Sequence, residues 1–434
     1  MKALTVAAIS LLGLAACERA TSERIEAWKG TQKGPDKIEA ALRSSNVPAN
    51  LRAEAAAALV DIGKPEKVDA IMASLAAGER WEILKSLVEI DIKLLGSPQL
   101  PKARDGRDTL FSVRPYAPPD EQKRIDTALL ANIEKDLSEG RFSGGRHSLD
   151  KLLTAIGSPA GPMLVRLLGD EKAPYKGLAE LLVKVCDEPT RDQGGKALLG
   201  RITPGKPIPT DMWLALGMLG GPTVTEFLST KMQKGPAEEA IAAARALQQS
   251  RFPSVLGLAL KLAGDAKADK GLRDEAFGVV EKIGGPEAQQ GLLRIIAEDK
   301  NDLVRYRAHE AALAVGKADA IVPALQAFGA KLSFKREDVI DFLVKDISKV
   351  GEKAKPAVLA ALASPSALAR MTAVLALEAP LPSNAKTRLG SAADAAALDK
   401  LAGDKASIKG FPAGVTVGSE AKRVALLLQG KGGS

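Results

Sequence analysis

Residues 271–286 read GLRDEAFGVVEKIGGP, and this stretch decides the fold. Its apolar residues recur at steps of four, four and three, on one face of an α-helix: Leu272, Ala276, Val280 and Ile283. Gly284 then stands at the end of the helix, where the left-handed backbone conformation is favoured. Only glycine adopts this conformation without strain. Pro286 suits the first turn of a following helix, where no N–H donor is needed. The stretch therefore predicts a helix, a tight junction and a second helix.

The same pattern recurs along the chain. An apolar residue followed by glycine closes one segment after another, at Gly63, Gly96, Gly157, Gly220, Gly284, Gly316 and Gly351. The spacings between these glycines are 33, 61, 63, 64, 32 and 35 residues, so most are near 32 or twice 32. An arginine stands 11 residues before four of them, as Arg52 before Gly63, Arg146 before Gly157, Arg273 before Gly284 and Arg305 before Gly316. This periodicity predicts helix pairs that stack into an array.

The Leu/Val-Arg opening and the Gly-Pro junction resemble HEAT-like repeats, particularly the short variety of about 30 residues, as in phycobilisome lyases. HEAT repeats often place an aspartate six residues before the arginine, which implies a polar ladder between repeats. Asp299 stands in that place before Arg305, whereas Lys267 before Arg273 departs from the pattern. The resemblance covers residues 34–378. It implies a HEAT-like or armadillo-type α-solenoid and almost nothing about function.

Length and composition agree with an extended array. The chain of 434 residues is longer than a domain with one hydrophobic core usually is. Of its residues, 46% are hydrophobic but only 3% are aromatic. A thin core between two helix layers needs few large rings. We expect an all-α solenoid over residues 34–380, and a C-terminal cap and flexible tail over residues 381–434. Residues 97–119, rich in proline and arginine, are expected to form an insertion loop, and the sequence leaves open whether it is a recognition element or a spacer.

The N-terminus predicts export and a lipid anchor. Within residues 1–16, Lys2 supplies a positive charge, and an apolar run follows it. The run is too short to cross a bilayer but fits a secretory signal. The run leads into LAAC, which resembles the lipobox of bacterial lipoproteins. The resemblance implies cleavage after Ala16 and acylation of Cys17, although an ordinary signal peptide with a chance cysteine is the alternative. We expect residues 17–33 to form a lipidated linker in the cell envelope, facing the periplasm or on the outer membrane.

The sequence shows no catalytic, metal or cofactor motif. His147 and His309 lie more than 150 residues apart, and Cys186 has no C-x-x-C partner, so a zinc site is not expected. Cys186 is better explained as a small buried core residue. The net charge of +8 comes from interspersed charges without a dense basic block, which argues against nucleic acid as a partner. We expect neither an enzyme nor a bound cofactor.

These features favour a membrane-anchored scaffold that binds protein partners. The second helices of the repeats would present the binding surface, with Arg307, Lys282 and Lys151 as candidate contacts. Two alternatives stay open. One is a pigment lyase or cofactor chaperone that uses a cleft of the solenoid. The other is a structural protein that binds the anionic envelope through its basic excess.

Overall fold

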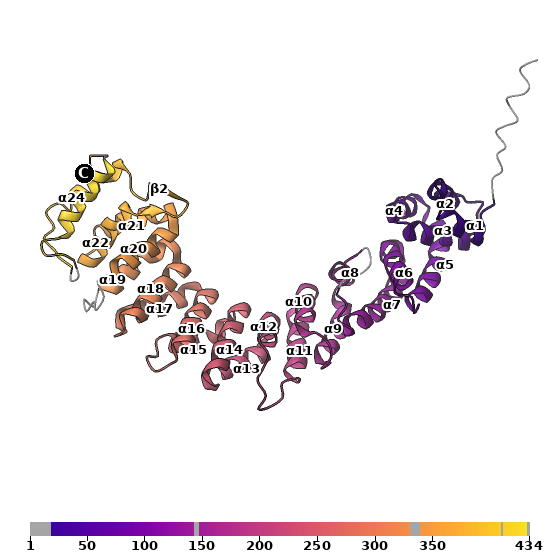
Figure 1. Ribbon diagram of the computed structural model, residues 1–434, viewed down its shortest axis with the longest axis horizontal. Coiled ribbons are helices and arrows are strands. Elements are labelled where there is room, and N and C mark those ends of the chain that lie inside the picture. Colours follow the sequence, from indigo (N-terminus) through magenta and orange to yellow (C-terminus); the bar gives the residue numbers. More distant parts are fainter. Residues whose placement is uncertain (1–18, 143–146, 330–338, 409–410, 432–434) are drawn as a thin grey trace, which may run out of the picture. The chain divides into compact units, whose positions relative to one another are not determined.

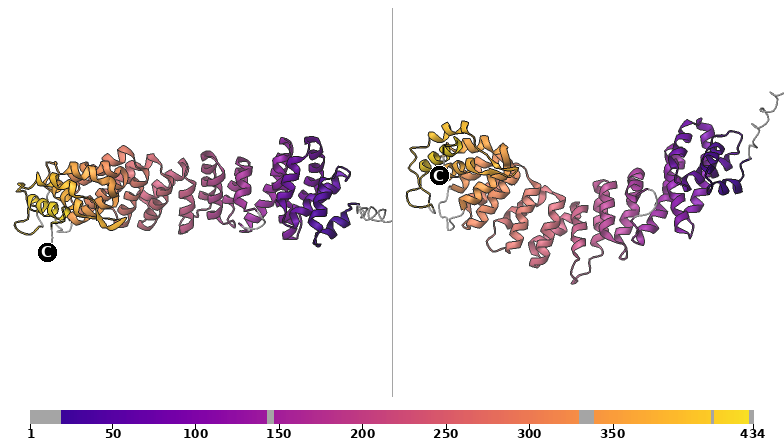
Figure 2. Two further views of the ribbon diagram at one scale, coloured as in Figure 1. Left: turned by 90° about the horizontal axis from the view of Figure 1, so that it is seen from above. Right: turned by 45° about the horizontal axis from the view of Figure 1, so that its top comes forward.

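The computed structural model describes residues 19–142, 147–329, 339–408 and 411–431. Within these residues the regular secondary structure is α-helical apart from one two-stranded hairpin and short 3-10 turns. It divides into two compact units, of which unit 1 ends at Arg201 and unit 2 begins at Ile202. Antiparallel helices stacked side by side make up each unit (Figures 1 and 2).

Unit 1 has two layers, because the chain alternates between them at successive turns. One layer consists of α2 (Gly34–Arg43), α4 (Pro65–Ser74), α6 (Leu100–Val113), α8 (Leu149–Ile156) and α10 (Tyr175–Val185). The other consists of α3 (Ala49–Asp61), α5 (Ala77–Leu95), α7 (Pro119–Ser138), α9 (Gly161–Gly169) and α11 (Glu188–Leu199). The 3-10 turns are η1 (Arg114–Tyr116) and η2 (Ser158–Ala160).

Unit 2 has the same construction. Its second-helix layer consists of α12 (Thr210–Leu219), α14 (Ala237–Ser250), α16 (Lys270–Ile283), α18 (Asp302–Gly316), α20 (Val339–Val350) and α22 (Ala367–Glu378). Its first-helix layer consists of α13 (Pro222–Lys234), α15 (Leu256–Ala263), α17 (Gly285–Glu298), α19 (Ile321–Gly329) and α21 (Lys355–Ala361). The 3-10 turns η3 (Pro253–Val255), η4 (Lys317–Ala320) and η5 (Gly351–Ala354) precede α15, α19 and α21.

Most of the predicted glycine junctions are confirmed. The backbone has φ of +83°, +78°, +63°, +65° and +76° at Gly63, Gly157, Gly220, Gly284 and Gly351 respectively. The prediction was wrong at Gly96, with φ −80°, and at Gly316, with φ −96°. At the latter junction Lys317 takes the positive φ, +51°. A Cβ on Gly316 would lie 2.8 Å from the Cβ of Ala320, so close packing accounts for this glycine.

The core between the layers is built from small and aliphatic side chains. The helical face predicted from residues 271–286 is inward, since Leu272, Ala276 and Val280 are buried. Small residues let the helices approach closely. A Cβ on Gly217 of α12 would lie 2.4 Å from the carbonyl oxygen of Ala246 in α14. Few aromatic rings are therefore needed to fill the core.

Residues 97–119 are not the predicted insertion loop. They form α6 and η1, and Pro119 opens α7. The prolines misled the prediction because they lie where helices tolerate them. Pro101 and Pro119 occupy first turns, and Pro115 lies in the 3-10 turn.

The arginines of α6 and η1 are used inside the fold. Arg107 is fully buried and its guanidinium lies 2.8 Å from Oδ2 of Asp136 in α7. Arg114 makes a bidentate pair with Asp126, at 2.5 and 2.9 Å. Because these charges pair within unit 1, α6 and η1 stabilise the fold and do not form a recognition loop.

The segment 17–33 is not simply a linker. Residues Ser22–Trp28 form α1, which packs on α2 and α3 and buries Ile25 and Trp28. The two side chains are three residues apart and so share one helical face. The stack therefore begins before residue 34, the predicted start.

The C-terminal segment from Leu381 packs on the end of unit 2. A short hairpin, β1 (Pro380–Leu381) with β2 (Asn384–Arg388), is followed by η6 (Ala392–Asp394), α23 (Ala395–Asp399) and α24 (Val417–Leu428). The last helix packs against α22 and α23. Arg370 of α22 holds the intervening loop through Asp404, at 2.7 Å.

Buried arginines join successive helices. Arg52 of α3 is 3% exposed. Its Nε donates to the carbonyl of Leu42 at the end of α2, at 2.7 Å, and its NH1 donates to Glu79 of α5, at 2.6 Å. Carbonyls in the last turn of a helix have no partner within that helix. Arg52 therefore caps one helix and ties it to the next helix pair.

Arg305 of α18 repeats this arrangement in unit 2. Its Nε donates to the carbonyl of Ile296 in the last turn of α17, at 2.7 Å, and its NH2 donates to the carbonyl of Phe328 in α19. The carboxylate paired with it is Asp302, at 3.4 Å. The predicted ladder residue Asp299 instead accepts a hydrogen bond from the backbone of Asn301. Burial lowers the pKa of Arg305, and the negative charges of Asp302 and Asp299 oppose that shift.

One stretch, Asp302–Gly329, is long and apolar enough to cross a membrane by length and composition. It comprises α18, η4 and α19, and the non-helical backbone of Lys317 interrupts it. It also buries Arg305 and His309 within unit 2. The stretch is therefore better explained as part of the helix stack.

Replacing Arg305 by alanine should lower the free energy of unfolding by about 2–4 kcal/mol, because two helix-end carbonyls lose a buried donor. Urea unfolding, together with hydrogen exchange of the amides in α17 to α19, measures this loss. Arg294→Ala, at an exposed position of α17, is the matched control and should change the free energy by less than about 0.5 kcal/mol. Equal effects of the two variants would contradict the capping role.

Candidate binding surface of unit 2

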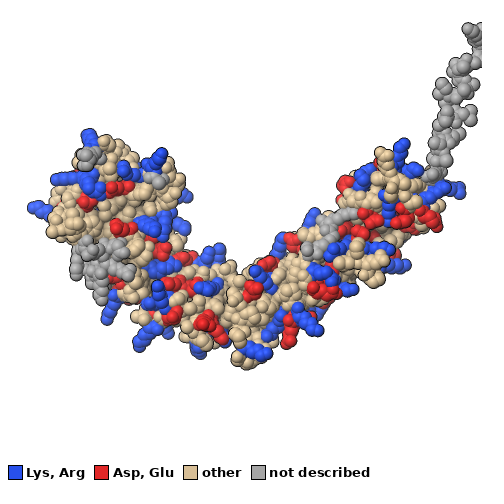
Figure 3. Space-filling model, viewed as in Figure 1, with Lys and Arg blue, Asp and Glu red and all other residues tan. Residues whose placement is uncertain are grey.

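Ion pairs cross the second-helix layer from one helix to the next. The pairs are Arg245 with Glu275 at 2.7 Å, Arg307 with Glu281 at 2.6 Å, and Lys349 with Glu310 at 3.2 Å. Each is partly exposed, so each stabilises the fold by only about 0–1 kcal/mol. Their main effect is to hold charges of both signs at fixed places. Figure 3 shows Lys, Arg, Asp and Glu side chains interspersed over the face of unit 2 in view.

A groove of about 810 Å³ lies along this layer, between α16, α18 and α20, and we call it the second-helix groove. Charged side chains of both signs line it together with a few apolar ones. They are Glu281, Arg307, Glu310, Lys317, Asp346, Lys349, Glu352, Lys353, Leu313, Ala314 and Val350. The groove therefore offers an apolar strip with charged edges.

Two buried polar side chains lie beneath the groove. His309 is fully buried and Asp346 is 2% exposed. Nδ1 of His309 is 3.7 Å from Oδ2 of Asp346, longer than a hydrogen bond but close enough for electrostatic attraction. Nζ of Lys349 is 2.8 Å from Oδ1 of Asp346. Burial alone would raise the pKa of Asp346, but His309 and Lys349 outweigh it and hold that pKa below its ordinary value.

An aromatic pair lies beside these groups. The rings of Tyr306 in α18 and Phe342 in α20 have centroids 5.0 Å apart, and both side chains are half-buried. Burial, reinforced by the charges of Asp346 and Glu310, raises the pKa of Tyr306 to about 12. The phenol therefore stays protonated at neutral pH. Half-exposed aromatic side chains are of the type that often anchors a protein partner, and this chain has few of them.

The arrangement suits recognition better than chemistry. Among the described residues, no group of three or more His, Cys, Asp or Glu side chains is placed to hold a metal ion. Asp346 and His309 are buried under the groove, and Asp346 is neutralised by Lys349. What reaches the surface is a set of paired charges, short apolar side chains and two aromatic rings.

Residues 225–314 match the family model described as HEAT repeats. They run from α13 into α18 and include Glu281, Arg307 and Glu310 of the second-helix groove. The chain is an all-α solenoid of stacked helix pairs, of which residues 225–314 match HEAT repeats. The fold class predicted from the sequence is thus confirmed. The sequence has no match among curated proteins.

Several solved structures match this chain at low sequence identity. An engineered protein of the Northeast Structural Genomics Consortium is 17% identical, with a TM-score of 0.29, and the match covers 92% of this chain and 99% of that chain. Kap121p is 12% identical, with a TM-score of 0.46, and the match covers 82% of this chain and 41% of that one. Importin beta is 13% identical, with a TM-score of 0.33, and the match covers 94% and 63%. The chain spans less than half of Kap121p, and none of these likenesses identifies a partner.

The candidate contacts predicted from the HEAT pattern are only partly brought together. Arg307 lines the second-helix groove, whereas Lys282 is exposed on α16 outside its lining. Lys151 is exposed on α8 of unit 1. Sequence reasoning missed Asp346 and Lys349. The signal available was their spacing of three residues on α20, which places them on one helical face.

The predicted repeat residues have structural roles where the structure describes them. Arg52 and Arg305 cap helices, and Arg273 is half-buried on α16. Arg146 lies outside the described residues, as do Ala16 and Cys17. The repeat signature therefore marks what holds the HEAT stack together and does not itself mark a binding site.

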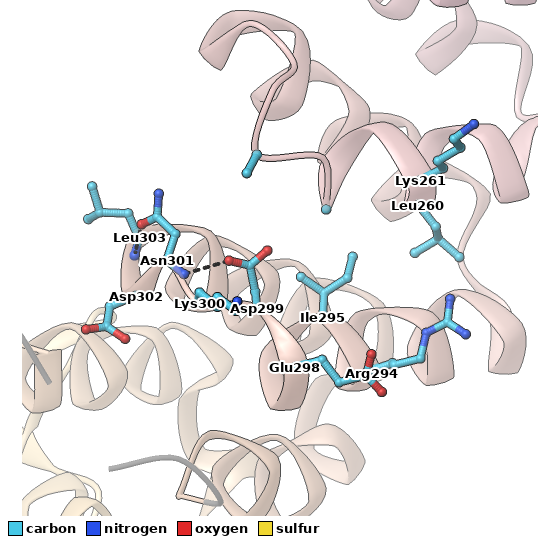
Figure 4. Close-up of a pocket in the computed structure, with 12 residues that line it drawn as sticks. Leu260, Lys261, Arg294, Ile295, Glu298, Asp299, Lys300, Asn301, Asp302 and Leu303 are labelled. Atoms are coloured by element: carbon cyan, nitrogen blue, oxygen red, sulfur yellow. Dashed lines mark hydrogen bonds between the residues drawn. The ribbon is translucent and has the colours of Figure 1, made fainter. Parts of the chain in front are cut away.

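A second groove, of about 790 Å³, opens on the first-helix layer between α15, α17 and the start of α18 (Figure 4). Its polar groups serve the turn that joins two helices. Asp299 accepts a hydrogen bond from the backbone of Asn301 at 2.7 Å, and Asn301 accepts one from the backbone of Leu303 at 3.0 Å. These groups are satisfied within the chain, which makes this groove the weaker candidate.

The remaining candidate chemical groups are packed into the fold. Cys186, predicted as buried, is half-buried at the end of α10, and burial raises the pKa of its thiol. A raised pKa leaves less thiolate and lowers reactivity. The ring of His147 is half-buried and packs against Phe111 of α6, with centroids 4.8 Å apart.

Asp346→Asn removes the carboxylate between His309 and Lys349. The pKa of Asp346 is held below 3.8, so its charge stabilises the fold at neutral pH, and this contribution is lost as the pH falls through the lowered pKa. We expect the variant to lose about 1–3 kcal/mol of unfolding free energy at pH 7, and the difference from wild type to shrink below about pH 4.

Urea unfolding at pH 7, 5 and 3 measures this difference. Asp341→Asn, at an exposed position of the same helix, is the matched control and should change the free energy by less than about 0.5 kcal/mol at each pH. A loss at Asp346 that is the same at pH 7 and pH 3 would show that its charge does not stabilise unit 2.

Proposed function

We propose that this HEAT-repeat protein is a lipid-anchored scaffold of a bacterial cell envelope, facing the periplasm or on the outer membrane, which binds a protein partner without catalysis. The second-helix groove of unit 2 carries the proposal. HEAT-repeat solenoids generally act as scaffolds for protein–protein interaction, and successive second helices offer a continuous surface for this.

The chemistry of the second-helix groove supports a protein segment as the ligand. Protein interfaces combine an apolar centre with a charged and polar rim, and most of their binding energy comes from a few aromatic and arginine side chains. Tyr306, Phe342 and Arg307 are of these types and lie on adjacent helices. The ion pairs of Arg307 and Lys349 hold their charges in place before a partner arrives, which reduces the ordering cost of binding.

The anchor rests on the sequence around Cys17. Acyl chains on that residue would hold the protein on a membrane without a spanning helix, since each buried CH₂ contributes about 0.8 kcal/mol. A tethered scaffold meets partners that diffuse along the same membrane, which fits an open binding surface.

Cys17→Ser should abolish incorporation of radiolabelled palmitate and move the protein from the membrane fraction to the soluble fraction, because the thiol that carries the acyl chains is absent. Cys186→Ser, the only other cysteine of the chain, is the matched control and should retain the label. Membrane retention of unlabelled Cys17→Ser protein would remove the anchor from the proposal.

Tyr306→Ala combined with Arg307→Ala should weaken capture of the partner at least tenfold, because truncation of anchoring residues typically costs 2 kcal/mol or more. The measurement is quantitative mass spectrometry of proteins crosslinked to the full chain in detergent-solubilised envelope. Lys261→Ala combined with Arg294→Ala, on the first-helix layer, is the matched control and should change capture by less than about twofold.

Equal loss in both double variants would indicate charge-driven adhesion. A stoichiometric partner that is captured equally by all forms would place the binding site elsewhere. Recovery of a pigment, lipid or glycan without any stoichiometric protein would replace the scaffold proposal.

A further inference from the structure

The positive charge of the chain is concentrated near its C-terminus. Residues 381–434 contain eight Lys and Arg against four Asp and Glu, an excess of four, while the whole chain of 434 residues has an excess of eight. One eighth of the chain therefore carries half of its net charge. We call the described residues of unit 2 from the start of β1 to Lys431 the C-terminal cap.

Three of the four acidic side chains of the cap hold it in place, whereas the fourth, Asp399, is exposed. Asp394 pairs with Lys355 of α21 at 2.7 Å, and Asp404 pairs with Arg370 of α22 at 2.7 Å. Glu420 pairs with Arg423 in the same helix at 2.8 Å. These carboxylates therefore neutralise cations that belong to the packing of the cap.

The other cations of the cap face solvent. Within the part of the chain that the structure describes, no ion pair engages six exposed side chains: Lys386, Arg388, Lys400, Lys405, Lys422 and Lys431. This contrasts with the second-helix layer, where cations pair across helices. Figure 3 shows Lys and Arg side chains around this end of unit 2. An unpaired positive surface is complementary to an anionic partner.

Two of these cations line a groove. A hollow of about 840 Å³, which we call the cap groove, lies between η5, α21, β2 and α24. The hairpin supplies Lys386 and Arg388, which are two residues apart and so lie on the same face of β2. Apolar side chains come from both sides: Pro356 and Leu359 of α21, Leu381 and Leu389 of the hairpin region, and Leu428 of α24.

The charge balance of the cap groove is one-sided. Glu352 is the one acidic residue among the described residues that line it, and Lys355 is already paired with Asp394. Lys386 and Arg388 also line a second hollow against α20 and α22, so they are accessible from both sides of the hairpin. The cap groove thus combines two free cations with a leucine-rich wall.

We propose that the cap groove binds an acidic segment of a protein, in extended conformation, in which carboxylates alternate with apolar side chains. In an extended chain, successive residues point to opposite sides, and residues two apart point to the same side at a separation of about 6.6 Å. Carboxylates at this spacing match Lys386 and Arg388 on one strand, while the intervening side chains meet Leu359 and Leu428. The protruding cations alone would attract a flat anionic membrane as well as an acidic peptide. The concave shape and apolar walls of the site favour the peptide.

The test is fluorescence anisotropy of a labelled ten-residue peptide of alternating Glu and Leu, titrated with the full chain at low and at physiological salt. Lys386→Ala combined with Arg388→Ala should weaken binding at least tenfold. The matched control is Lys400→Ala combined with Lys405→Ala, because these lysines are equally exposed, belong to the same cap and do not line the cap groove. It should change binding by less than about twofold. Thermal unfolding verifies that both double variants remain folded, as expected for exposed positions.

Three outcomes would overturn the proposal. Equal weakening in both double variants would show that the whole cationic surface acts without the groove. Equally tight binding of a peptide of alternating Glu and Ser would show that the leucine wall takes no part. Tighter binding to phosphatidylglycerol vesicles than to the peptide, lost equally in both variants, would make the cap a membrane-binding surface. Selective loss in the Lys386 and Arg388 variant, seen only with the Glu-Leu peptide, would support the cap groove.

Discussion

Arginine side chains that reach the ends of neighbouring helices are the interaction on which this structure depends. A thin stack of short helices has many helix ends, and each end leaves carbonyl groups without a partner in its own helix. Arg52 and Arg305 supply donors to such carbonyls from inside the core. The half-buried Arg201 donates to the carbonyl of Leu168 in the last turn of α9 and to that of Ala173 in the loop that follows. The guanidinium suits this role because its five donors can serve several acceptors at once. At Arg52 and Arg305, the recurring arginine 11 residues before the glycine junction is therefore part of the packing and not a surface feature.

This mode of assembly tolerates irregularity, because each helix pair contacts only its neighbours. Helix α6 is an extra helix between the second and third pairs of unit 1. As a result α5, the second helix of its pair, shares a layer with α7 and α9, which open later pairs. Ion pairs cross this change of order: Arg124 of α7 lies 2.5 Å from Glu89 of α5, and Arg166 of α9 lies 3.0 Å from Glu134 of α7. After the single extra helix α6, the first helices of later pairs therefore occupy the layer that second helices occupied before it. The stack continues without a break.

The sequence predicts the regular features of this fold and misses those that depend on tertiary contacts. The helical faces and five of the glycine junctions are local, so periodicity and backbone preference suffice to find them. Residues 97–119 were misassigned because prolines signal a loop, although Pro101 and Pro119 lie in first turns where a helix tolerates them. The second-helix groove could not be predicted, since it requires knowing that Glu310 and Lys349, 39 residues apart, lie 3.2 Å from each other. Repeat patterns fix which residues point inward and say little about which outward residues meet across helices.

The pairing of charges then separates two kinds of surface within unit 2. Along the second-helix layer, cations face carboxylates of the next helix, so a partner there meets a nearly neutral surface and must gain its affinity from shape and from Tyr306 and Phe342. On the cap, Asp394, Asp404 and Glu420 are engaged in packing and six of the described cations are in no ion pair, so affinity there would depend on charge and therefore on ionic strength. Glu352 lines both the second-helix groove and the cap groove. A ligand cation that paired with Glu352 in one groove would offset its negative charge in the other, so this single side chain of η5 would link the two surfaces electrostatically.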